Sequence, residues 1–425
     1  MGYIILIILN ILSPLVGAGV ILMFLFSPRR NLLKNLKNEF SERFVMRPKR
    51  QILGGYIWMH AASVGEVRSV VKIAQQLKDY YKRPILITTL TAAGRAAAEK
   101  EPVFDTAALA PLDFYPFVKK FLKIYTPRRL FIIEADLWPN MLVCCAKNNV
   151  PAGIINGRLS ARSAGRYKLI APLMKLVFKN MAFVCAQNEE IKDRYISLGL
   201  QADKAHICGN IKYDMLNEDP AHQEKVREIL NMLGWQNSQI ITCGSTHEVE
   251  ERVIISAAQK LPDTKFIIAP RHLERKKQIT AMLDESGLKY AVLSKRGGYP
   301  ADAQILLADT MGWLGALYNA AAAAFVGGSI AKKGGHNFLE AAALGKPVLM
   351  GKYSYNAPEV AAKLLQTKGG FLVDENNFAE VIKDLISSQP GLAAASDAAR
   401  GAALSFKGAT DKTMAVVKEY ESKRT

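Results

Sequence analysis

A glycine-rich run toward the C-terminus has the composition of an anion-binding loop. Between Ala324 and Gly351 it reads AFVGGSIAKKGGHNFLEAAALGKPVLMG: a strand-like segment, two glycine pairs and a helix-like segment. Glycines let backbone N–H groups close on an anion, and the following helix presents its unpaired N–H groups and positive dipole end at the same place. The run therefore predicts a cradle for a nucleotide phosphate, although its spacing matches neither a P-loop nor a dinucleotide fingerprint.

Asn337 and Glu340 in this run are three residues apart, which places both side chains on one face of a helix. A carboxylate at that position can accept hydrogen bonds from both hydroxyls of a ribose. The same spacing is equally typical of a helix N-cap and its capping-box partner. Both interpretations stay open at this point.

Three acidic residues follow strand-like segments in the first half of the chain. Glu66, in HAASVGEV, opens a helix after a strand, where a carboxylate can act as a general base on a hydroxyl or simply stabilise the helix dipole. Glu134 and Asp136, in LFIIEADLWPN, stand at the carboxyl end of another strand. A lone E-x-D pair is too common to predict a metal site, so no metal ligand is assigned.

Other polar residues stand where they could meet a phosphate or a carboxylate. Ser245, in GSTHEVEE, forms a predicted capping box with Glu248, and the start of that helix could also hold phosphate. Pro270 and Arg271 end a strand, and the planar fork of an arginine suits phosphate or carboxylate. Lys212, in GNIKYD between the two halves of the chain, either reaches a ligand or is a solvated lysine.

Three arginines recur every four residues in GRLSARSAGR: Arg158, Arg162 and Arg166. On a helix this spacing predicts one basic stripe. The stripe is either a solvated face or a site for the phosphate of an acceptor.

Alternating strand-like and helix-like segments must position these residues. In the first half the predicted strands are 57–60, 84–90, 130–133, 152–155 and 183–186, and the predicted helices are 67–81, 114–125, 137–149 and 167–179. After a polar interval, the second half repeats the alternation with strands at 240–243, 265–269, 290–293, 305–307, 323–326 and 347–350. This pattern predicts an α/β protein of two Rossmann-like, doubly wound domains that face a cleft, with ligands at the carboxyl ends of the strands.

The composition fits a two-domain globular protein with a polyanionic or membrane partner. The chain has 425 residues, of which 50% are hydrophobic, enough to bury two cores. Lysine and arginine exceed aspartate and glutamate by 56 − 38 = 18, and this charge does not choose between the two kinds of partner. The five cysteines lack metal-ligand spacing and are interpreted as buried thiols in a reducing compartment.

The first residues predict a membrane contact. Tyr3 to Phe26 carry no charge and, at about 1.5 Å per residue, could cross a hydrocarbon layer of about 30 Å as a helix. The alternative is an apolar segment that lies in the membrane interface. Basic residues follow between Arg29 and Arg50, so the positive-inside rule predicts a cytoplasmic body whose basic segment meets anionic membrane lipids.

Eight motifs that occur in order carry a family resemblance: HAASVGE, EADLWPN, INGRLSARSAGRY, GNIKYD, GSTHEVEE, APRHLER, ADTMGWL and the glycine-rich run. The set resembles the 3-deoxy-D-manno-octulosonic acid (Kdo) transferase family of lipopolysaccharide synthesis. The resemblance implies a GT-B glycosyltransferase, anchored by its N-terminal helix at the cytoplasmic face of the inner membrane. Such an enzyme moves Kdo from CMP-Kdo to a lipid A precursor with inversion, and the resemblance implies no cofactor, no metal ion and no nucleic-acid partner.

The resemblance also implies roles for individual residues. Glu66 matches the family's catalytic base, and Glu134 and Lys212 match residues that stabilise charge in the transition state. The residues that match the CMP-binding segments are Pro270, Arg271, Met311, Gly312, Trp313, Asn337, Phe338, Leu339 and Glu340. Ser245, Arg158 and Arg162 complete the expected substrate-binding set. The chain departs from the family pattern at Trp313, where Glu is common, at Phe338, where Pro is common, and at Ala135 and Asp136, where T-E is common.

We therefore expect an anchor at 1–28, a basic membrane-apposed segment at 29–55, an acceptor-binding domain at 56–213 and a CMP-sugar-binding domain at 214–425, whose last helix can return to the first domain. Two other functions stay open. One is another nucleotide-sugar transferase, such as a UDP-sugar transferase, or an epimerase of the same fold. The other is a non-catalytic scaffold at the membrane surface that binds polyanions through its basic stripe.

Overall fold

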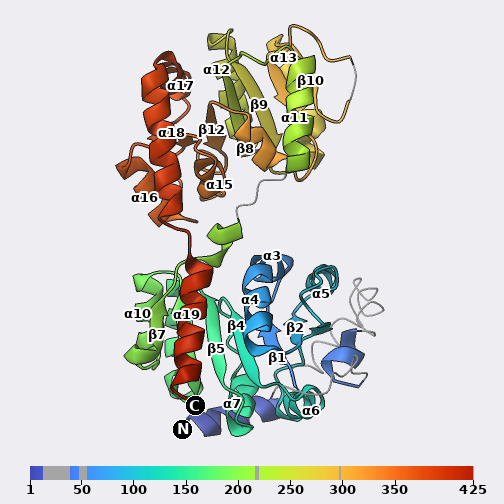
Figure 1. Cartoon of the computed structure of the whole chain (residues 1–425), viewed down its shortest axis with the longest axis vertical. Coiled ribbons are helices and arrows are strands. Elements are labelled where there is room, and N and C mark those ends of the chain that lie inside the picture. Colours follow the sequence, from blue (N-terminus) through green and yellow to red (C-terminus); the bar gives the residue numbers. More distant parts are fainter. Residues whose placement is uncertain (13–38, 47–54, 216–219, 296–297, 425) are drawn as a thin grey trace. The chain divides into compact units, whose positions relative to one another are not determined.

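A computed structural model describes residues 1–12, 39–46, 55–215, 220–295 and 298–424 (Figure 1). They divide into two compact units. Unit 1 contains Met1–Met215 and Lys407–Thr425, and unit 2 contains Leu216–Phe406.

Unit 1 is built on a seven-stranded parallel sheet with the order β3-β2-β1-β4-β5-β6-β7. Its strands are β1 (Ile57–His60), β2 (Ile85–Thr89), β3 (Thr106–Leu109), β4 (Arg129–Ile133), β5 (Ala152–Gly157), β6 (Met181–Ala186) and β7 (Ala205–Ile207). Its helices are α3 (Val64–Ser69), α4 (Val71–Tyr81), α5 (Ala92–Ala98), α6 (Tyr115–Tyr125), α7 (Pro139–Lys147), α8 (Ala161–Lys168), α9 (Ala171–Lys179), α10 (Glu189–Ser197) and α19 (Ala409–Ser422), with the short 3-10 turns η1 (Ala202–Lys204) and η2 (Ile211–Met215). The order 3-2-1-4-5 within the sheet is that of the Rossmann fold.

Both faces of the unit 1 sheet are buried, because alternate strand residues point to opposite sides. Trp58 in β1 and Leu130 in β4 belong to one core, which helices α6, α7 and α9 cover. Ile57 and Met59 belong to the core on the other face. All five cysteines of the chain are buried free thiols.

The C-terminal helix α19 is part of unit 1, where it packs against α4 and β6 (Figure 1). Its first turn is capped by Asp214, whose carboxylate accepts hydrogen bonds from the backbone N–H groups of Gly408 (2.7 Å) and Thr410 (2.6 Å). Val417 is fully buried in the core of this face. The last helix thus belongs to unit 1, the arrangement that the sequence analysis allowed for the end of the chain, and α19 completes the core of this unit.

Unit 2 contains a second seven-stranded parallel sheet, with the order β10-β11-β9-β8-β12-β13-β14. Its strands are β8 (Ile240–Thr246), β9 (Lys265–Pro270), β10 (Tyr290–Val292), β11 (Ile305–Leu307), β12 (Ala323–Val326), β13 (Val348–Met350) and β14 (Gly370–Leu372). Its helices are α11 (Pro220–Met232), α12 (Glu248–Lys260), α13 (Lys276–Ser286), α14 (Leu314–Asn319), α15 (Phe338–Ala343), α16 (Pro358–Gln366), α17 (Phe378–Ser387) and α18 (Gln389–Leu404), with the turn η3 (Leu273–Arg275). Separate cores again cover the two faces of the sheet.

The structure departs from the predicted elements at a few places. The strands β3, β7 and β14 have no predicted counterpart, and each is a short edge or near-edge strand. The helix predicted at 67–81 is two helices, because Val70 has a non-helical conformation (φ −104°, ψ 0°). The helix predicted at 167–179 likewise breaks after Lys168, and Pro172 stands in the first turn of α9, where its missing N–H is tolerated.

Only the beginning of the expected membrane segment, Tyr3 to Phe26, is described. Residues 2–12 are helical, and Leu6 packs between Val143 of α7 and Leu173 of α9. Residues 13–26 and most of the basic segment lie outside the described residues. In the part of the chain that is described, no helix combines the length and hydropathy that a membrane crossing needs.

Candidate active site

Glu66 lies in the first turn of α3, directly beyond the carboxyl end of β1. Ser63 caps this helix, and its hydroxyl donates a hydrogen bond to Glu66 Oε1 (3.0 Å). The other carboxylate oxygen of Glu66 accepts the backbone N–H of Ala62 at 2.8 Å. Glu66 thus has the first-turn position that the helix-dipole interpretation expects, and its half-buried carboxylate keeps lone pairs free to accept a proton.

Glu134 directly follows β4 and has a left-handed backbone (φ 63°), which is uncommon for a residue other than glycine. The carbonyl of Glu134 accepts hydrogen bonds from the Tyr195 hydroxyl (3.1 Å) and the Arg158 backbone N–H (3.3 Å). Its carboxylate oxygen Oε1 lies 2.5 Å from Nζ of Lys212. Strained conformations of this kind, fixed by several hydrogen bonds, are concentrated at functional sites.

Lys212 is not the solvated lysine that the sequence left open, because its ammonium group pairs with Glu134. The turn η2 is held to the sheet by Asn156, the next-to-last residue of β5, whose Oδ1 accepts the Ile211 N–H at 3.1 Å. Asn156 also has a left-handed backbone (φ 57°) and is buried. The turn therefore fixes Lys212 at the carboxyl edge of the unit 1 sheet.

Asp136 lies beside these residues. One of its carboxylate oxygens is 3.6 Å from Nε2 of the buried His60 and has no hydrogen-bond partner among the described residues. The indole N–H of Trp138 donates to the same His60 nitrogen (3.2 Å), which must therefore be an acceptor. The other ring nitrogen, Nδ1, lies 2.9 Å from the Thr88 hydroxyl.

The carboxylates of Glu134 and Asp136 act on Glu66. Burial raises the pKa of Glu66 above its ordinary value, and the negative charges of Glu134 and Asp136 raise it further. The hydrogen bonds from Ala62 and Ser63 oppose this rise. Unit 1 therefore brings together one carboxylate of raised proton affinity and an acidic residue paired with a lysine, as acid–base chemistry requires.

The predicted arginine stripe is only partly correct. Arg162 and Arg166 are exposed on α8, whereas Arg158 comes before this helix and directly follows β5. The Arg158 backbone N–H bonds to the Glu134 carbonyl, so of the three arginines Arg158 lies next to the acidic residues.

In unit 2 the predicted capping box of Ser245 and Glu248 is wrong. Ser245 is still part of β8, and the N-cap of α12 is His247, whose backbone N–H donates to Glu250 Oε2 at 3.0 Å. Ser245 has a left-handed backbone (φ 55°). A Cβ atom at Gly327 would lie 2.3 Å from the Ser245 carbonyl oxygen, so these two strand ends can approach only with glycine at 327.

The capping box of Asn337 and Glu340, one of the two interpretations that the sequence left open, does not form. Asn337 is the N-cap of α15, but its side chain makes no capping bond. Glu340 is half-buried, and burial raises its pKa. Its carboxylate lies near α14, 4.0 Å from where a Cβ atom of Gly315 would be. Helix α15 of the glycine-rich run and the first turn of α14 are therefore adjacent.

The other residues that the sequence predicts to bind the sugar donor differ widely in their solvent exposure. Met311 is 77% exposed, and Trp313 forms the N-cap of α14 and packs edge-on against His222 at 4.8 Å between ring centroids. Arg271 is exposed directly after β9, and its backbone N–H donates to the Thr246 carbonyl (3.0 Å). Phe338 and Leu339 are both 1% exposed, so their side chains belong to the core and only their backbone can meet a ligand.

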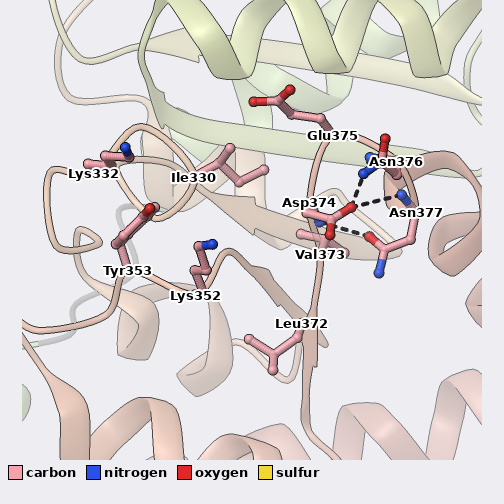
Figure 2. Close-up of a pocket in the computed structure, with 10 residues that line it drawn as sticks. All are labelled: Ile330, Lys332, Lys352, Tyr353, Leu372, Val373, Asp374, Glu375, Asn376 and Asn377. Carbon is pink, nitrogen blue, oxygen red and sulfur yellow. Dashed lines mark hydrogen bonds between the residues drawn. The ribbon is translucent and has the colours of Figure 1, made fainter.

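A pocket of about 420 Å³ opens elsewhere in unit 2 (Figure 2). Residues 330–332 and 352–353 face the turn 373–377 across it, and Asp374 accepts backbone hydrogen bonds from Asn376 and Asn377. The pocket shares Ile330 and Lys332 with the glycine-rich run but contains none of the predicted donor residues. We therefore do not assign the donor to it.

Three histidines at the edge of the unit 2 sheet were not predicted as site residues. His247, His272 and His336 follow β8, β9 and β12 in that order, and these strands are neighbours in the sheet. The signal was present in the sequence, because GSTH, APRH and GGH each place a histidine shortly after a predicted strand.

Comparison with solved structures identifies the fold. The chain is similar to the UDP-GlcNAc 2-epimerase from Neisseria meningitidis (TM-score 0.59, 16% identity, 86% of this chain and 100% of the other). It is equally similar to a glycosyltransferase from Rickettsia africae (TM-score 0.59, 14% identity, 87% and 99%). Residues 252–402 match the family described as glycosyl transferases group 1. The two parallel-sheet α/β units thus have the fold of GT-B glycosyltransferases.

Sequence relatives identify the family within this fold. Residues 38–215 match the family described as 3-deoxy-D-manno-octulosonic-acid transferase. The chain is 32% identical to the 3-deoxy-D-manno-octulosonic acid transferase of Haemophilus influenzae, over 86% of this chain and 87% of the relative. It is 30% identical to that of Chlamydophila psittaci, over 80% and 79%. The chain belongs to the 3-deoxy-D-manno-octulosonic acid transferase family.

Proposed function

We propose that the protein transfers Kdo from CMP-Kdo to a lipid A precursor. The observation that carries the proposal is the group formed by Glu66, Glu134 and Lys212 at one edge of the unit 1 sheet, in a chain of this family. It supplies a carboxylate of raised proton affinity and, beside it, a cation held by a second carboxylate. Both are useful in direct displacement at a sugar carbon.

In the proposed reaction Glu66 is the general base. Its carboxylate takes the proton of the acceptor hydroxyl, and the hydroxyl oxygen forms a bond to the anomeric carbon of Kdo. The bond between that carbon and the phosphate oxygen breaks, and CMP leaves with the electron pair. Because the nucleophile enters opposite the leaving group, the anomeric configuration inverts.

Lys212 and Glu134 stabilise charge in this proposal. Positive charge develops on the sugar ring and negative charge on the leaving phosphate as the bond to CMP breaks. A fixed ammonium group and a fixed carboxylate can each stabilise one of these charges without reorganising. The ion pair, the left-handed backbone of Glu134 and the anchoring of η2 all support such a preorganised arrangement.

The donor is assigned to unit 2. Glu340 is a half-buried carboxylate for which no hydrogen bond to a described residue is found, so it can accept the ribose hydroxyls. Pro270, Arg271, Met311, Gly312 and Trp313 supply the neighbouring loops. Asn337 adds its side chain, Phe338 and Leu339 their backbone, and Ser245 the strand end beside the glycines. The acceptor's phosphate is assigned to Arg158 and Arg162 of unit 1.

We also propose that the protein works at the inner face of the cytoplasmic membrane. The N-terminal helix at residues 2–12 turns Leu6 and Asn10 toward unit 1, where Asn10 bonds to Asn140 (2.8 Å). Its opposite face is apolar and exposed, with Ile4 at 60% and Ile7 at 57%. Such a face suits the membrane interface, whether or not residues 13–26, outside the described part, cross the bilayer.

The alternatives carried by the sequence receive less support. The similarity to an epimerase is below 25% identity and shows the fold alone. A polyanion scaffold would not need the strained Glu134 or its pairing with Lys212. Competition binding distinguishes the proposed function from a UDP-sugar transferase or an epimerase. The proposed function requires CMP to outcompete UMP and UDP.

The decisive experiment measures CMP release by the full-length protein in detergent, with CMP-Kdo, with and without a tetra-acylated lipid A precursor, in the presence of a metal chelator. We expect release that depends on the acceptor and a matching mass gain on the lipid. If the folded protein binds CMP but releases no CMP from CMP-Kdo, the assignment of the lipid A precursor as acceptor is wrong. If the folded protein does not bind CMP, the assignment of CMP-Kdo as donor is wrong as well.

A further inference from the structure

Two histidine side chains meet at the carboxyl edge of the unit 2 sheet. Nε2 of His247 lies 3.1 Å from Nε2 of His336, and the two rings are nearly parallel (16°) with centroids 5.4 Å apart. The ring of His272 is 5.8 Å from that of His247. The three residues come from loops after three neighbouring strands, so only the tertiary fold brings them together.

The buried carboxylate of Glu250 holds these loops in place. It accepts backbone N–H groups of the glycine-rich run from Gly328 (2.9 Å), Ile330 (3.0 Å) and Ala331 (3.2 Å), and also from His247 (3.0 Å). The carboxylate oxygens of Glu250 therefore already accept hydrogen bonds from the loops that this residue holds together. Its negative charge acts on His247 from the side of the protein.

Several cationic groups also act on the histidines. Arg271 and His272 act on His336 from the loop after β9, and Lys333 and Arg275 act on His247 from the glycine-rich run and η3. Arg275 is neutralised by an ion pair with Glu251 at 2.8 Å, and His272 faces Glu274 at 3.4 Å. Within the described ranges neither Arg271 nor Lys333 has a carboxylate partner.

The short distance between the two Nε2 atoms limits how many protons the histidine pair can hold. One Nε2–H donates to the lone pair of the other Nε2, so the two rings share a single proton along this line. Two protonated rings would direct N–H groups at each other. Burial and these cations accordingly lower the pKa of His336 to about 4, and burial lowers that of His247.

We propose that His247 and His336 form a subsite for an anionic group of the ligand bound by unit 2, in which each imidazole donates its Nε2–H to the anion. The chemistry is that of a phosphate or carboxylate oxygen with two donors beside Arg271 and Lys333. For the donor under Proposed function, on which this inference rests, both the phosphate and the carboxylate of the sugar acid qualify. The mutual histidine bond is replaced when the anion enters.

Ligand binding is then coupled to proton uptake. An anion between the two rings raises their pKa values, because it favours the charged imidazolium form. At a pH above the pKa of the empty pair and below that of the occupied pair, binding takes up protons, and affinity rises as the pH falls. A site that contacts only the cytidine and ribose would show no such coupling.

The test is isothermal titration calorimetry of the full-length protein at pH 7.5 in two buffers of different ionisation enthalpy. The probes are cytidine, CMP, free Kdo and CMP-Kdo. We expect proton uptake with CMP and none with cytidine. The phosphate of CMP cannot supply this signal, since cationic neighbours lower its pKa and would release protons instead.

Variants assign the uptake to the pair. His247→Gln and His336→Gln should each weaken CMP binding about tenfold or more and abolish the uptake, since a hydrogen bond to a charged group is lost. His206→Gln, which makes the same change in unit 1, should bind CMP like the wild type. Thermal unfolding of each variant checks that the loops remain folded.

The outcomes separate this inference from the proposed function. Uptake with CMP assigns the subsite to phosphate, and uptake only with free Kdo or CMP-Kdo assigns it to carboxylate. CMP and CMP-Kdo binding with no proton uptake by the wild type, and with unchanged affinity in both histidine variants, would overturn the histidine subsite and leave the proposed function standing. Absence of CMP and CMP-Kdo binding would overturn the proposed function itself.

Discussion

The ammonium nitrogen of Lys212 lies 2.5 Å from Oε1 of Glu134, although the two residues are 78 positions apart in the chain. Glu134 is 14% exposed at its side chain and Lys212 is 40% exposed, so one partner is embedded and the other reaches solvent. The pair is therefore fixed on the protein side and open on the side from which a substrate would approach.

Breaking this ion pair should lower the rate of Kdo transfer and leave the affinity for CMP unchanged. Lys212→Met and Glu134→Gln should each lower kcat about 10²- to 10³-fold, as expected for the loss of one preorganised charge. The double variant should lose less than the product of the two effects, because the residues act as a unit. Steady-state kinetics and CMP titration measure both quantities.

A matched control is the exposed ion pair of Lys192 and Glu189, at 2.7 Å on the surface of unit 1. Surface pairs contribute about 0–1 kcal/mol to stability, so Lys192→Met should leave kcat unchanged. Wild-type turnover in Lys212→Met would remove Lys212 from the proposed mechanism.

Glu66→Gln should lower transfer about 10²- to 10⁴-fold without changing CMP affinity, because the amide cannot accept the acceptor's proton. In the wild type, activity should rise with pH through the pKa of Glu66, since the base must be ionised. That pKa is raised by burial and by the neighbouring carboxylates.

Asp136→Asn should shift the acid limb of the kcat/KM profile to lower pH. Removing one negative charge next to Glu66 makes the carboxylate easier to ionise, so its pKa falls. Asp79→Asn, on the exposed face of α4, is the control and should leave the profile in place. A shift in the opposite direction would be incompatible with Glu66 as the base.

Glu340→Ala should weaken CMP binding about tenfold, the effect of losing a charged hydrogen-bond acceptor for the ribose. The substitution should have a smaller effect on cytidine analogues that lack the ribose hydroxyls. Glu359→Ala, in the first turn of α16, provides the same change on an exposed helix of unit 2. Equal affinities in the two variants would argue against Glu340 as a ribose ligand.

Asp214→Asn should destabilise the attachment of α19 by about 1.5–3 kcal/mol, because the amide has one acceptor oxygen where the carboxylate uses two, and a hydrogen bond to a charged group is lost. Amides of α19 should exchange hydrogen faster, while those of the unit 2 sheet should not change. Asp203→Asn, at an exposed position of the same unit, is the control. Unchanged exchange in α19 would mean that apolar packing of Val417 alone holds the helix.

Glutamate at Ile4 and Ile8 should reduce binding of the protein to anionic lipid vesicles, since burying each isoleucine contributes about 1.5–3 kcal/mol. Both residues are exposed on the N-terminal helix, at 60% and 48%. Vesicle sedimentation measures the bound fraction. Met232→Glu, which alters a 61% exposed apolar residue of unit 2, should have no effect.

The sequence by itself determined the alternation of strands and helices, and with it the two α/β units. Apolar runs such as 130–133 and 152–155 contain this information locally, because strands covered on both faces must be apolar throughout. The same local logic located Glu66, Glu134 and the glycine-rich run at strand ends. Short edge strands such as β14 lack this signal and were missed.

The tertiary structure alone decided which of these residues meet. Sequence spacing suggested local capping boxes for Ser245 and Asn337, but long-range packing made His247 the cap and left Asn337 without a capping bond. The order of strands in each sheet likewise pairs Lys212 with Glu134 and gathers the histidines of unit 2. Strand order and the return of α19 to unit 1 depend on the burial of two whole cores, and no short stretch of sequence contains that information.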